Sequence, residues 1–556
     1  MRGFGVRFSA ADASRGVAFA GADVETLGPY RIVGNVRLDA RDDLRTRLSM
    51  RDRDLSDKAL CLHAYARWGE RFVDVLAGDF CFALWDESRH CLLAARDRLG
   101  IRPLFHAFVG GTALVSDSLD WIMSHAEVPR DLDETWIGDF LIAGFGLDFD
   151  RTVRRHVQRV PPAHLLKVSA QGESLRRYWQ LEIGDPIFFK DRRLYTERFR
   201  ELVAEAVRDR LPKGRVGIAM SGGLDSPTLA AAAVAVTGDP SRVVAECFHY
   251  KELMPDREAH FSALVARKLG IELLLREADS SVYDPLWRER GVHTAEPTLT
   301  IVQAHPEAEV ARRSGETAGV WFFGEGPDDA LPFDRDPYFS WLRSRRDWSG
   351  LARALVDYTR VKGFAGWRST LARGLRRRGP GGFLGYGIPS WINPEFAERL
   401  KIGQRLEGVG MYGTETHPWH PGAVGAFKDP IWPALFDNLR SSEMAGGFEW
   451  RHPFLDLRVL EYMISVPPVP WAWRKQLLRE AMRGRLPAEV LARNKSPLAR
   501  QPLLGPLGEH GFPPLSGSAA FTGYVVVDAL PPRQSLPVNP DKVVAAHALD
   551  YWLAQE

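Results

Sequence analysis

The chain has 556 residues, and its 73 Lys and Arg residues nearly balance its 71 Asp and Glu residues, giving a formal net charge of +2. This balance excludes the strong general attraction to nucleic acid or to an anionic membrane that a basic protein has, and neither is expected as a partner. The length provides material for several domains or for two large ones.

Cysteine usage and apolar patterning indicate the compartment. The four cysteines (Cys61, Cys81, Cys91 and Cys247) are too few and too irregularly spaced for a disulfide framework or a metal knuckle, so we expect reduced, mostly buried thiols. No stretch approaches the roughly 18–20 apolar residues that cross a bilayer, and the amino terminus shows no signal-peptide pattern. We therefore expect a cytoplasmic protein.

Residues 1–185 are predicted to form a β-rich first domain. Short alternating apolar runs, separated by Gly, Asp and Pro turns, predict strands at 31–36, 80–85 and 91–95. The apolar spacing over Asp57–Trp68 predicts a helix. A polar, Pro-containing segment at 184–193 predicts a linker to the next domain.

Residues 195–556 are predicted to form a second domain of the α/β class. Helical spacing at 195–210 is followed by apolar runs that alternate with helical segments and predict parallel strands at 216–220, 243–250, 272–275 and 319–323. This alternation is typical of a doubly wound sheet, whose ligand site lies at the carboxyl ends of the strands. A mostly helical region and then a Pro- and Gly-rich tail after Lys495 are expected to follow.

The run after the first of these strands has the pattern strand, glycine turn, helix. It consists of Ser221, Gly222, Gly223, Leu224, Asp225 and Ser226. Two glycines allow a tight turn close to a ligand, and the hydroxyls and free N–H groups at the helix start donate to anionic oxygens. The run therefore predicts a phosphate-binding loop, although an ordinary Gly-rich turn has the same local pattern.

A second acidic turn follows the strand predicted at 319–323. It consists of Gly324, Glu325, Gly326, Pro327, Asp328 and Asp329. Such a turn by itself is usually only a turn. Because the carboxyl ends of parallel strands meet at one edge of a sheet, however, we expect Asp225 and Asp328 to converge there and to hold Mg²⁺ on a triphosphate.

Two lysines near the carboxyl end are candidates for contacts to the same phosphates. On a helix, Lys475 and Arg479 would share a face at i, i+4, which in most proteins is only a solvated basic edge. Lys495 follows a Pro-interrupted helix, where a loop lysine can reach inward. Two lysines at the phosphates would offset the charge that develops when an anhydride bond breaks.

These motifs together resemble the asparagine synthetase superfamily (class B type), and so do 451–456 and the first-domain runs 56–57, 76–86 and 95–104. The resemblance implies an N-terminal nucleophile (Ntn) hydrolase-like α/β/β/α sandwich that serves as a glutamine amidotransferase. It also implies an ATP-pyrophosphatase domain, similar to the adenine nucleotide α-hydrolases, that adenylates a carboxylate and passes it to an amine. ATP and Mg²⁺ are the implied cofactors.

The first domain departs from this pattern at its chemistry. Family members that hydrolyse glutamine begin Met-Cys-Gly, whereas the second residue here is Arg2 and no cysteine occurs before Cys61. Where the family has Asn-Gly-Glu, this chain has a cation, Arg37, in place of the carboxylate that holds the substrate ammonium. Asp57, the other expected ligand, remains. We therefore predict that the first domain is inactive and that ammonia from glutamine is not the nucleophile.

Among family members without the cysteine, the resemblance favours a lasso peptide macrolactam synthetase. Such a cyclase adenylates an Asp or Glu side chain of a ribosomal core peptide and lets its terminal amine close an isopeptide ring. A leader-binding protein and a leader protease are possible further partners. In this interpretation Lys475 touches the phosphates, Lys495 steadies the charged intermediate, and Glu325 either positions or deprotonates the amine or only braces its loop.

Three alternatives stay open at this point. A β-lactam-type synthetase would cyclise a small amino acid. In that group, however, the resemblance implies a tyrosine at the position that Glu325 occupies here. An ammonia-dependent asparagine synthetase would use free aspartate. A non-catalytic scaffold would not need the acidic loops. The basic run at 373–378 either meets an acidic peptide or is a solvated loop.

Overall fold

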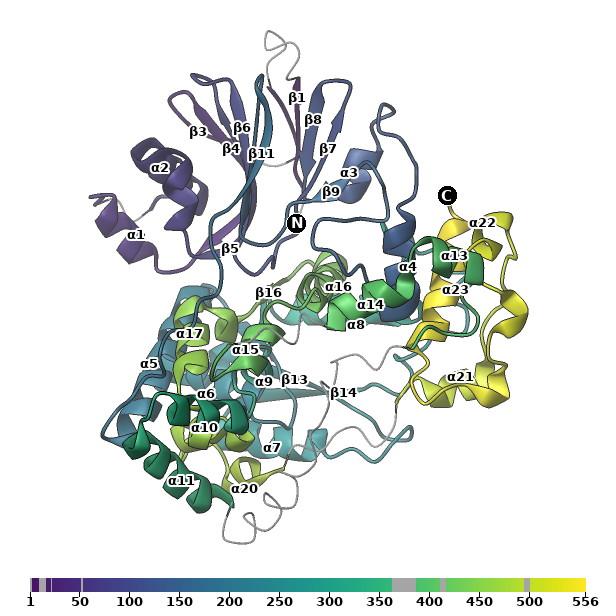
Figure 1. Cartoon of the computed structure of the whole chain (residues 1–556). Helices are drawn as coiled ribbons and strands as arrows, with labels where there is room; N and C mark the ends of the chain where they lie inside the picture. Colours follow the sequence, from purple (N-terminus) through teal and green to yellow (C-terminus); the bar gives the residue numbers. More distant parts are fainter. Residues whose placement is uncertain are drawn as a thin grey trace.

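The computed structural model describes residues 3–9, 17–21, 23–51, 54–362, 387–410, 417–494 and 501–556. The amino-terminal part contains two antiparallel sheets, which are stacked in the upper half of Figure 1. One sheet has the order β2-β1-β8-β7-β9, with strands Val17–Ala20, Gly5–Ser9, Thr112–Ser116, Phe105–Val109 and Gln158–Arg159. The other has the order β11-β10-β6-β5-β4-β3, with strands Gly172–Arg177, His164–Ser169, Cys91–Arg96, Gly78–Asp86, Tyr30–Leu38 and Glu25–Leu27.

Strand β5 shows why these layers form. Its alternate side chains point to opposite faces of the sheet, and apolar residues occupy both sets. Phe80, Phe82 and Leu84 pack against helix α2 (Asp57–Trp68) on the outer face. Cys81 and Trp85 pack between the two sheets.

Helices cover the outer faces of both sheets. Helices α1 (Arg41–Arg47) and α2 lie outside the six-stranded sheet, and α3 (Leu119–Met123) packs on the five-stranded one. Helix α4 (Glu134–Ala143) follows. The predicted α/β/β/α sandwich is confirmed, and the helix predicted at Asp57–Trp68 has those bounds.

The remaining part contains a five-stranded parallel sheet of the order β14-β13-β12-β15-β16, and every adjacent pair is parallel. Its strands are Glu272–Glu277, Val243–His249, Val216–Ala219, Val320–Phe322 and Glu449–Arg451. The four predicted strands are confirmed. The edge strand β16 was not predicted, because three residues are too few to show a period.

Helices cover both faces of this sheet, as expected for a doubly wound fold. One face packs against α5 (Arg192–Arg210), α6 (Asp225–Thr237), α7 (Glu258–Leu269), α17 (Leu457–Ser465) and α19 (Gln476–Ala481). The other face packs through Trp321 against α8 (Ala304–Thr317) and α16 (Ile431–Gly446).

The other helices extend this part of the molecule. They are α9 (Pro327–Ala330), α10 (Arg335–Ser344), α11 (Trp348–Lys362), α13 (Pro394–Arg399), α14 (Ile402–Gly410), α15 (Pro421–Ala426), α18 (Pro468–Trp471), α20 (Ala488–Ala492), α21 (Leu504–His510), α22 (Ala519–Thr522) and α23 (Asp541–Leu553). The expected Pro- and Gly-rich tail thus contains helices, and α23 packs against α4 (Figure 1). Among the described residues, no helix is both long and apolar enough to cross a membrane.

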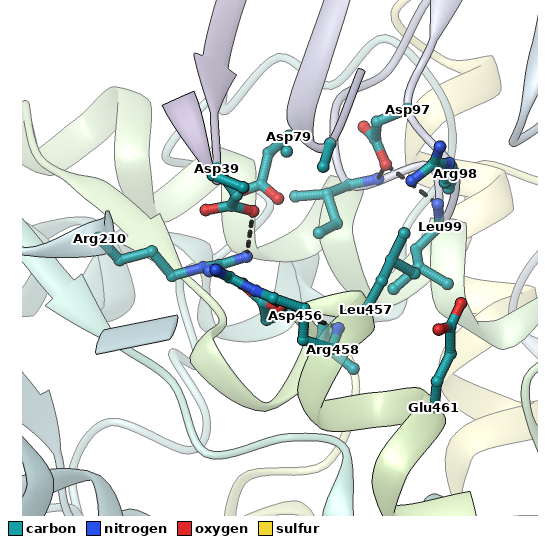
Figure 2. A pocket seen from close by; sticks show the side chains of 15 residues that line it. Asp39, Asp79, Asp97, Arg98, Leu99, Arg210, Asp456, Leu457, Arg458 and Glu461 are labelled. Atoms are coloured by element: carbon teal, nitrogen blue, oxygen red, sulfur yellow. Dashed lines mark hydrogen bonds and ion pairs between the residues drawn. The ribbon is translucent and has the colours of Figure 1, made fainter. Parts of the chain in front are cut away.

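Buried ion pairs join the two parts of the chain. Arg210, at the end of α5, is 1% exposed and lies 2.7 Å from Asp39 after β4 and 2.7 Å from Asp456 before α17. Figure 2 shows these side chains around a small cavity of about 210 Å³. Burial acts to raise the pKa of Asp456, but Arg210 and Arg458 outweigh it and hold that pKa below its ordinary value. The division at 1–185 and 195–556 stays a prediction.

Candidate active site

The first predicted loop connects β12 to α6 and lies at the carboxyl end of the central strand. Ser226, in the first turn of α6, accepts a hydrogen bond from the backbone N–H of Ser221 (2.9 Å), and the Ser221 hydroxyl accepts one from Gly223 (3.2 Å). Leu224 is the residue before the helix, and its side chain does not cap it. The amino terminus of this 13-residue helix therefore presents its positive dipole end beside the loop.

Gly222 is clamped by two residues that the sequence analysis did not assign to the site. Its N–H donates to Glu258 (2.5 Å), and its carbonyl accepts from Arg493 (2.6 Å), which also forms an ion pair with Glu258 (2.6 Å). A Cβ at Gly222 would lie 2.5 Å from Arg493 and 2.8 Å from Phe261, so only glycine fits here. Glu258 could have been suspected from the sequence, because it lies shortly after the predicted strand at 243–250.

The second predicted loop connects β15 to α9 and lies against the first. A Cβ at Gly324 would stand 3.1 Å from the backbone nitrogen of Ser226, so the two loops approach each other backbone to backbone. Glu325 follows Gly324, and Asp328 lies inside α9. The expectation that the two acidic turns share one edge of the sheet is therefore met.

Lys475 joins the two loops. Its Nζ lies 2.5 Å from Oδ2 of Asp225 and 2.7 Å from Oδ1 of Asp328. Burial acts to lower the pKa of this lysine, but the two carboxylates outweigh it and raise the pKa above its ordinary value, so the ammonium stays charged. Two acids from the loops after separate strands thus meet at one cation.

The backbone around Lys475 differs from the expected helix. Arg474 and Lys475 have φ values of 50° and 55°, a left-handed conformation that non-glycine residues rarely adopt, and α19 begins only at Gln476. This turn directs Lys475 to the acidic loops. The predicted shared face of Lys475 and Arg479 is wrong, because Arg479 instead donates to backbone carbonyls, including that of Arg493 (2.8 Å).

Two sequence predictions fall outside the described residues. Lys495 lies in the segment 495–500, and the basic run at 373–378 lies in the segment 363–386. Their roles stay predictions.

The site has the chemistry that a magnesium–triphosphate group requires. Carboxylate oxygens are the ligands that Mg²⁺ prefers, and Asp225 and Asp328 each direct one at the same point, where Lys475 now bridges them. The N–H groups at the start of α6 and the hydroxyls of Ser221 and Ser226 are donors suited to phosphate oxygens. The residues present fit the group.

The pKa of the Glu325 carboxyl group is raised. Burial, and then the negative charges of Asp329, Asp328 and Asp225, raise its pKa to about 7, while Lys475 acts in the opposite direction. A carboxyl group with a pKa near neutrality exchanges protons readily at the pH of the cell. Glu325 is therefore suited to take up a proton beside the phosphate-binding loops.

A large cavity adjoins the second loop. Its volume is about 1380 Å³, and its lining includes Glu325 and Asp329 of the second loop together with Gly3 and Phe4 of the amino-terminal segment. Other lining residues come from α4, from 292–300 and from α16. Both parts of the chain therefore line one space that reaches Glu325 and Asp329 of the second loop.

Glutamine hydrolysis by a cysteine nucleophile needs an accessible thiol, and none of the described thiols is accessible. All four cysteines of the sequence are buried, and burial raises the pKa of Cys81 to about 12 and that of Cys247 to about 11. Arg37 is 9% exposed and donates to Asp79 (3.0 Å) and Asp39 (2.6 Å), so it is turned into the domain junction. The loss of glutamine hydrolysis stays a prediction.

Comparison with known proteins identifies the family. Residues 198–515 match the asparagine synthase family, and residues 25–179 match a glutamine amidotransferase domain. The chain belongs to the asparagine synthase family. It is accordingly an ATP-dependent carbon–nitrogen ligase that forms AMP.

The curated relatives have low sequence identity to this chain but align with most of its length. Glutamine-hydrolyzing asparagine synthetase 3 of Bacillus subtilis is 26% identical over 488 residues, which is 84% of this chain and 75% of the relative. Amidase chyE of Penicillium rubens is 26% identical over 468 residues, covering 74% of this chain and 66% of the relative. Amidase chry2 of Gibberella zeae is 27% identical over 498 residues, covering 79% and 72%.

Proposed function

We propose that this ligase closes an isopeptide ring in a ribosomal peptide, as a lasso peptide macrolactam synthetase. The observation that carries the proposal is the cavity beside Glu325. Small-molecule sites usually measure roughly 300–1,000 Å³, and the cavity here exceeds that range at about 1380 Å³. Aspartate or another small amino acid would leave most of it empty, whereas a folded peptide would fill it.

The predicted loss of glutaminase chemistry favours the same function. Without an accessible thiol, the enzyme needs an amine from elsewhere, and a peptide carries its own. Its terminal amine has a pKa of roughly 8, so a useful fraction is neutral at cytoplasmic pH. Holding the amine and the acid of one molecule together makes the attack intramolecular, which supplies several kcal/mol.

The chemistry has two steps. A side-chain carboxylate oxygen of the peptide attacks the α-phosphorus of ATP, the bond to the β-phosphate oxygen breaks, and pyrophosphate leaves. The peptide amine then attacks the activated carbonyl carbon, AMP leaves, and the amine loses a proton to a base. We assign the loop from Ser221 to Ser226 to the pyrophosphate, Lys475 to the phosphates and Glu325 to the proton. Lys495 is the proposed partner of the charged intermediate.

Asp225 and Asp328 are the proposed magnesium ligands. When bound, the ion neutralises phosphate charge and orients the triphosphate. A separate leader-binding protein and a leader protease are proposed to deliver the core peptide. No nucleic acid or membrane takes part in this scheme.

Synthetic core peptides test the function. We expect the purified chain with ATP and Mg²⁺ to convert a peptide with a free amino terminus and one Asp or Glu into a product that has lost one water, with AMP formed in equal amount. An N-acetylated copy is expected to drive ATP–pyrophosphate exchange without ring closure, because it keeps the acid and lacks the amine. An Asn or Gln copy is expected to drive neither. Mass spectrometry and the exchange assay measure both steps.

Other outcomes select the alternatives. Labelled asparagine from aspartate and ammonium would replace the proposal by asparagine synthesis. A lactam formed from a small amino acid would favour a β-lactam-type synthetase. If no carboxylate, over a panel of peptides with the acid at successive positions, drives exchange, the chain is a scaffold.

Glu325 provides a prediction on pH. Because its pKa is raised to about 7, it is mostly protonated below that pH and ionised above it. If it accepts the amine proton, ring closure rises with pH through about 7. Glu325→Gln is expected to slow ring closure by about 10²-fold and to remove the rise near pH 7, leaving only the rise near roughly pH 8 that deprotonation of the peptide amine produces, with ATP–pyrophosphate exchange nearly unchanged. An unaltered profile in the variant would show that Glu325 only braces its loop.

A further inference from the structure

The lining of the large cavity has a strong excess of acidic side chains. It contains ten Asp and Glu residues, three Arg residues and no lysine. The three arginines are already neutralised: Arg159 pairs with Asp437 (2.6 Å), Arg440 with Asp117 (2.6 Å) and Arg151 with Asp148 (2.7 Å). Even after these pairs, carboxylates dominate the charge of the cavity.

Aromatic side chains accompany these acids. The lining includes Phe4, Phe105, Trp121, Trp136, Phe145, Phe149 and Trp432. Ring faces carry a negative quadrupole that attracts cations, and they also pack against apolar side chains. A lining of acids and aromatic rings therefore prefers a ligand that combines positive charge with apolar groups.

Glu307 is the acid best placed to contribute. It lies on α8, lines the cavity with an exposed side chain, and accepts one hydrogen bond from Gln303 (2.7 Å). No ion pair to Glu307 occurs among the described residues, so a cation entering the cavity would be its first charged partner.

We infer that this cavity selects a peptide segment that carries positively charged side chains next to aromatic or aliphatic ones. The inference deepens the proposed function, on which it rests for the identity of the cavity's occupant. The peptide inferred here is basic, whereas the basic run at 373–378 suggested an acidic one. Surface charge of one sign inside a partly enclosed space raises the local concentration of oppositely charged ligands and excludes those of like charge.

Two synthetic probes test the inference on the full chain without ATP. Both are fluorescent peptides of equal length with the same aromatic residues, and they differ only in carrying Lys or Glu at the remaining positions. We expect the Lys probe to bind at least about tenfold more tightly at low salt, with a difference that shrinks as salt is added. Fluorescence anisotropy measures both affinities. Equal affinities, or preference for the Glu probe, would overturn the inference.

A charge reversal locates the binding. Glu307→Lys is expected to weaken the Lys probe by at least about fivefold, whereas Glu316→Lys, which makes the same change on an exposed part of the same helix outside the cavity, is expected to leave it unchanged. Glu307→Gln, a smaller perturbation, should give an intermediate loss. Equal effects of Glu307→Lys and Glu316→Lys would place the probe outside the cavity and overturn the inference.

The outcome is separable from that of the proposed function. Tight binding of the Lys probe without ring closure in any peptide would leave the cation preference standing while the cyclase assignment fails. Ring closure with equal affinity for both probes would support the cyclase assignment and overturn the cation preference.

Discussion

Asp225→Asn or Asp328→Asn is expected to reduce AMP formation by at least about 10³-fold. Each change keeps the size of the side chain but removes the negative charge that faces Lys475 and the proposed magnesium. An amide oxygen is a weaker ligand than a carboxylate, and the remaining acid alone does not balance the ion and the lysine. ATP–pyrophosphate exchange with an active peptide measures the loss, and it reports adenylation without requiring ring closure.

Asp336→Asn is the matched control. Asp336 lies in the same part of the chain, its side chain is 76% exposed, and it pairs only with the neighbouring Arg335 in the contacts described. Its AMP formation should equal that of the parent protein. Turnover retained in either the Asp225 or the Asp328 variant, with the fold intact by circular dichroism, would refute the metal assignment.

Arg210→Ala is expected to destabilise the protein by about 3–5 kcal/mol, because two buried carboxylates lose a shared cation and keep only one charged partner each, Arg37 for Asp39 and Arg458 for Asp456. Asp39 and Asp456 would then face each other in the small cavity of Figure 2 without the guanidinium between them. Since the chain is large, the thermal midpoint measured by calorimetry is the appropriate readout, and it should fall by several degrees. The amino-terminal part would lose a main connection to the ligase part.

Arg215→Ala provides the comparison for that effect. Arg215 also pairs with an acid, Glu272, but the two side chains are 40% and 53% exposed. Exposed pairs contribute only about 0–1 kcal/mol, so the thermal midpoint should scarcely change. If Arg210→Ala were no more destabilising than Arg215→Ala, the buried cluster would not hold the two parts together.

Regular elements with a clear period were predictable from the sequence. The apolar spacing over Asp57–Trp68 gave the bounds of α2, and the run at 80–85 became the centre of β5. In both cases the local pattern and the tertiary burial agree, since β5 is covered on both faces. The three-residue strand β16 escaped prediction because its place depends on pairing with β15 and not on its own sequence.

The candidate site was predictable only in part. Asp225 and Asp328 followed from the rule that parallel strands end at one edge. The clamp on Gly222 by Glu258 and Arg493 did not, because it joins residues 235 positions apart that meet only in the folded chain. The position of Lys475 depends on left-handed backbone at two consecutive residues, which tertiary contacts impose against the local preference.

An isotope experiment tests the central claim that a peptide carboxylate is adenylated beside the cluster of Asp225, Lys475 and Asp328. The acceptor side chain of a core peptide is labelled with heavy oxygen in both carboxylate positions, and the AMP released on ring closure is analysed by mass spectrometry. Attack of the carboxylate on the α-phosphorus transfers one of these oxygens, so we predict AMP with a single heavy oxygen and an isopeptide that keeps the other. Unlabelled AMP from a completed ring closure would contradict the account.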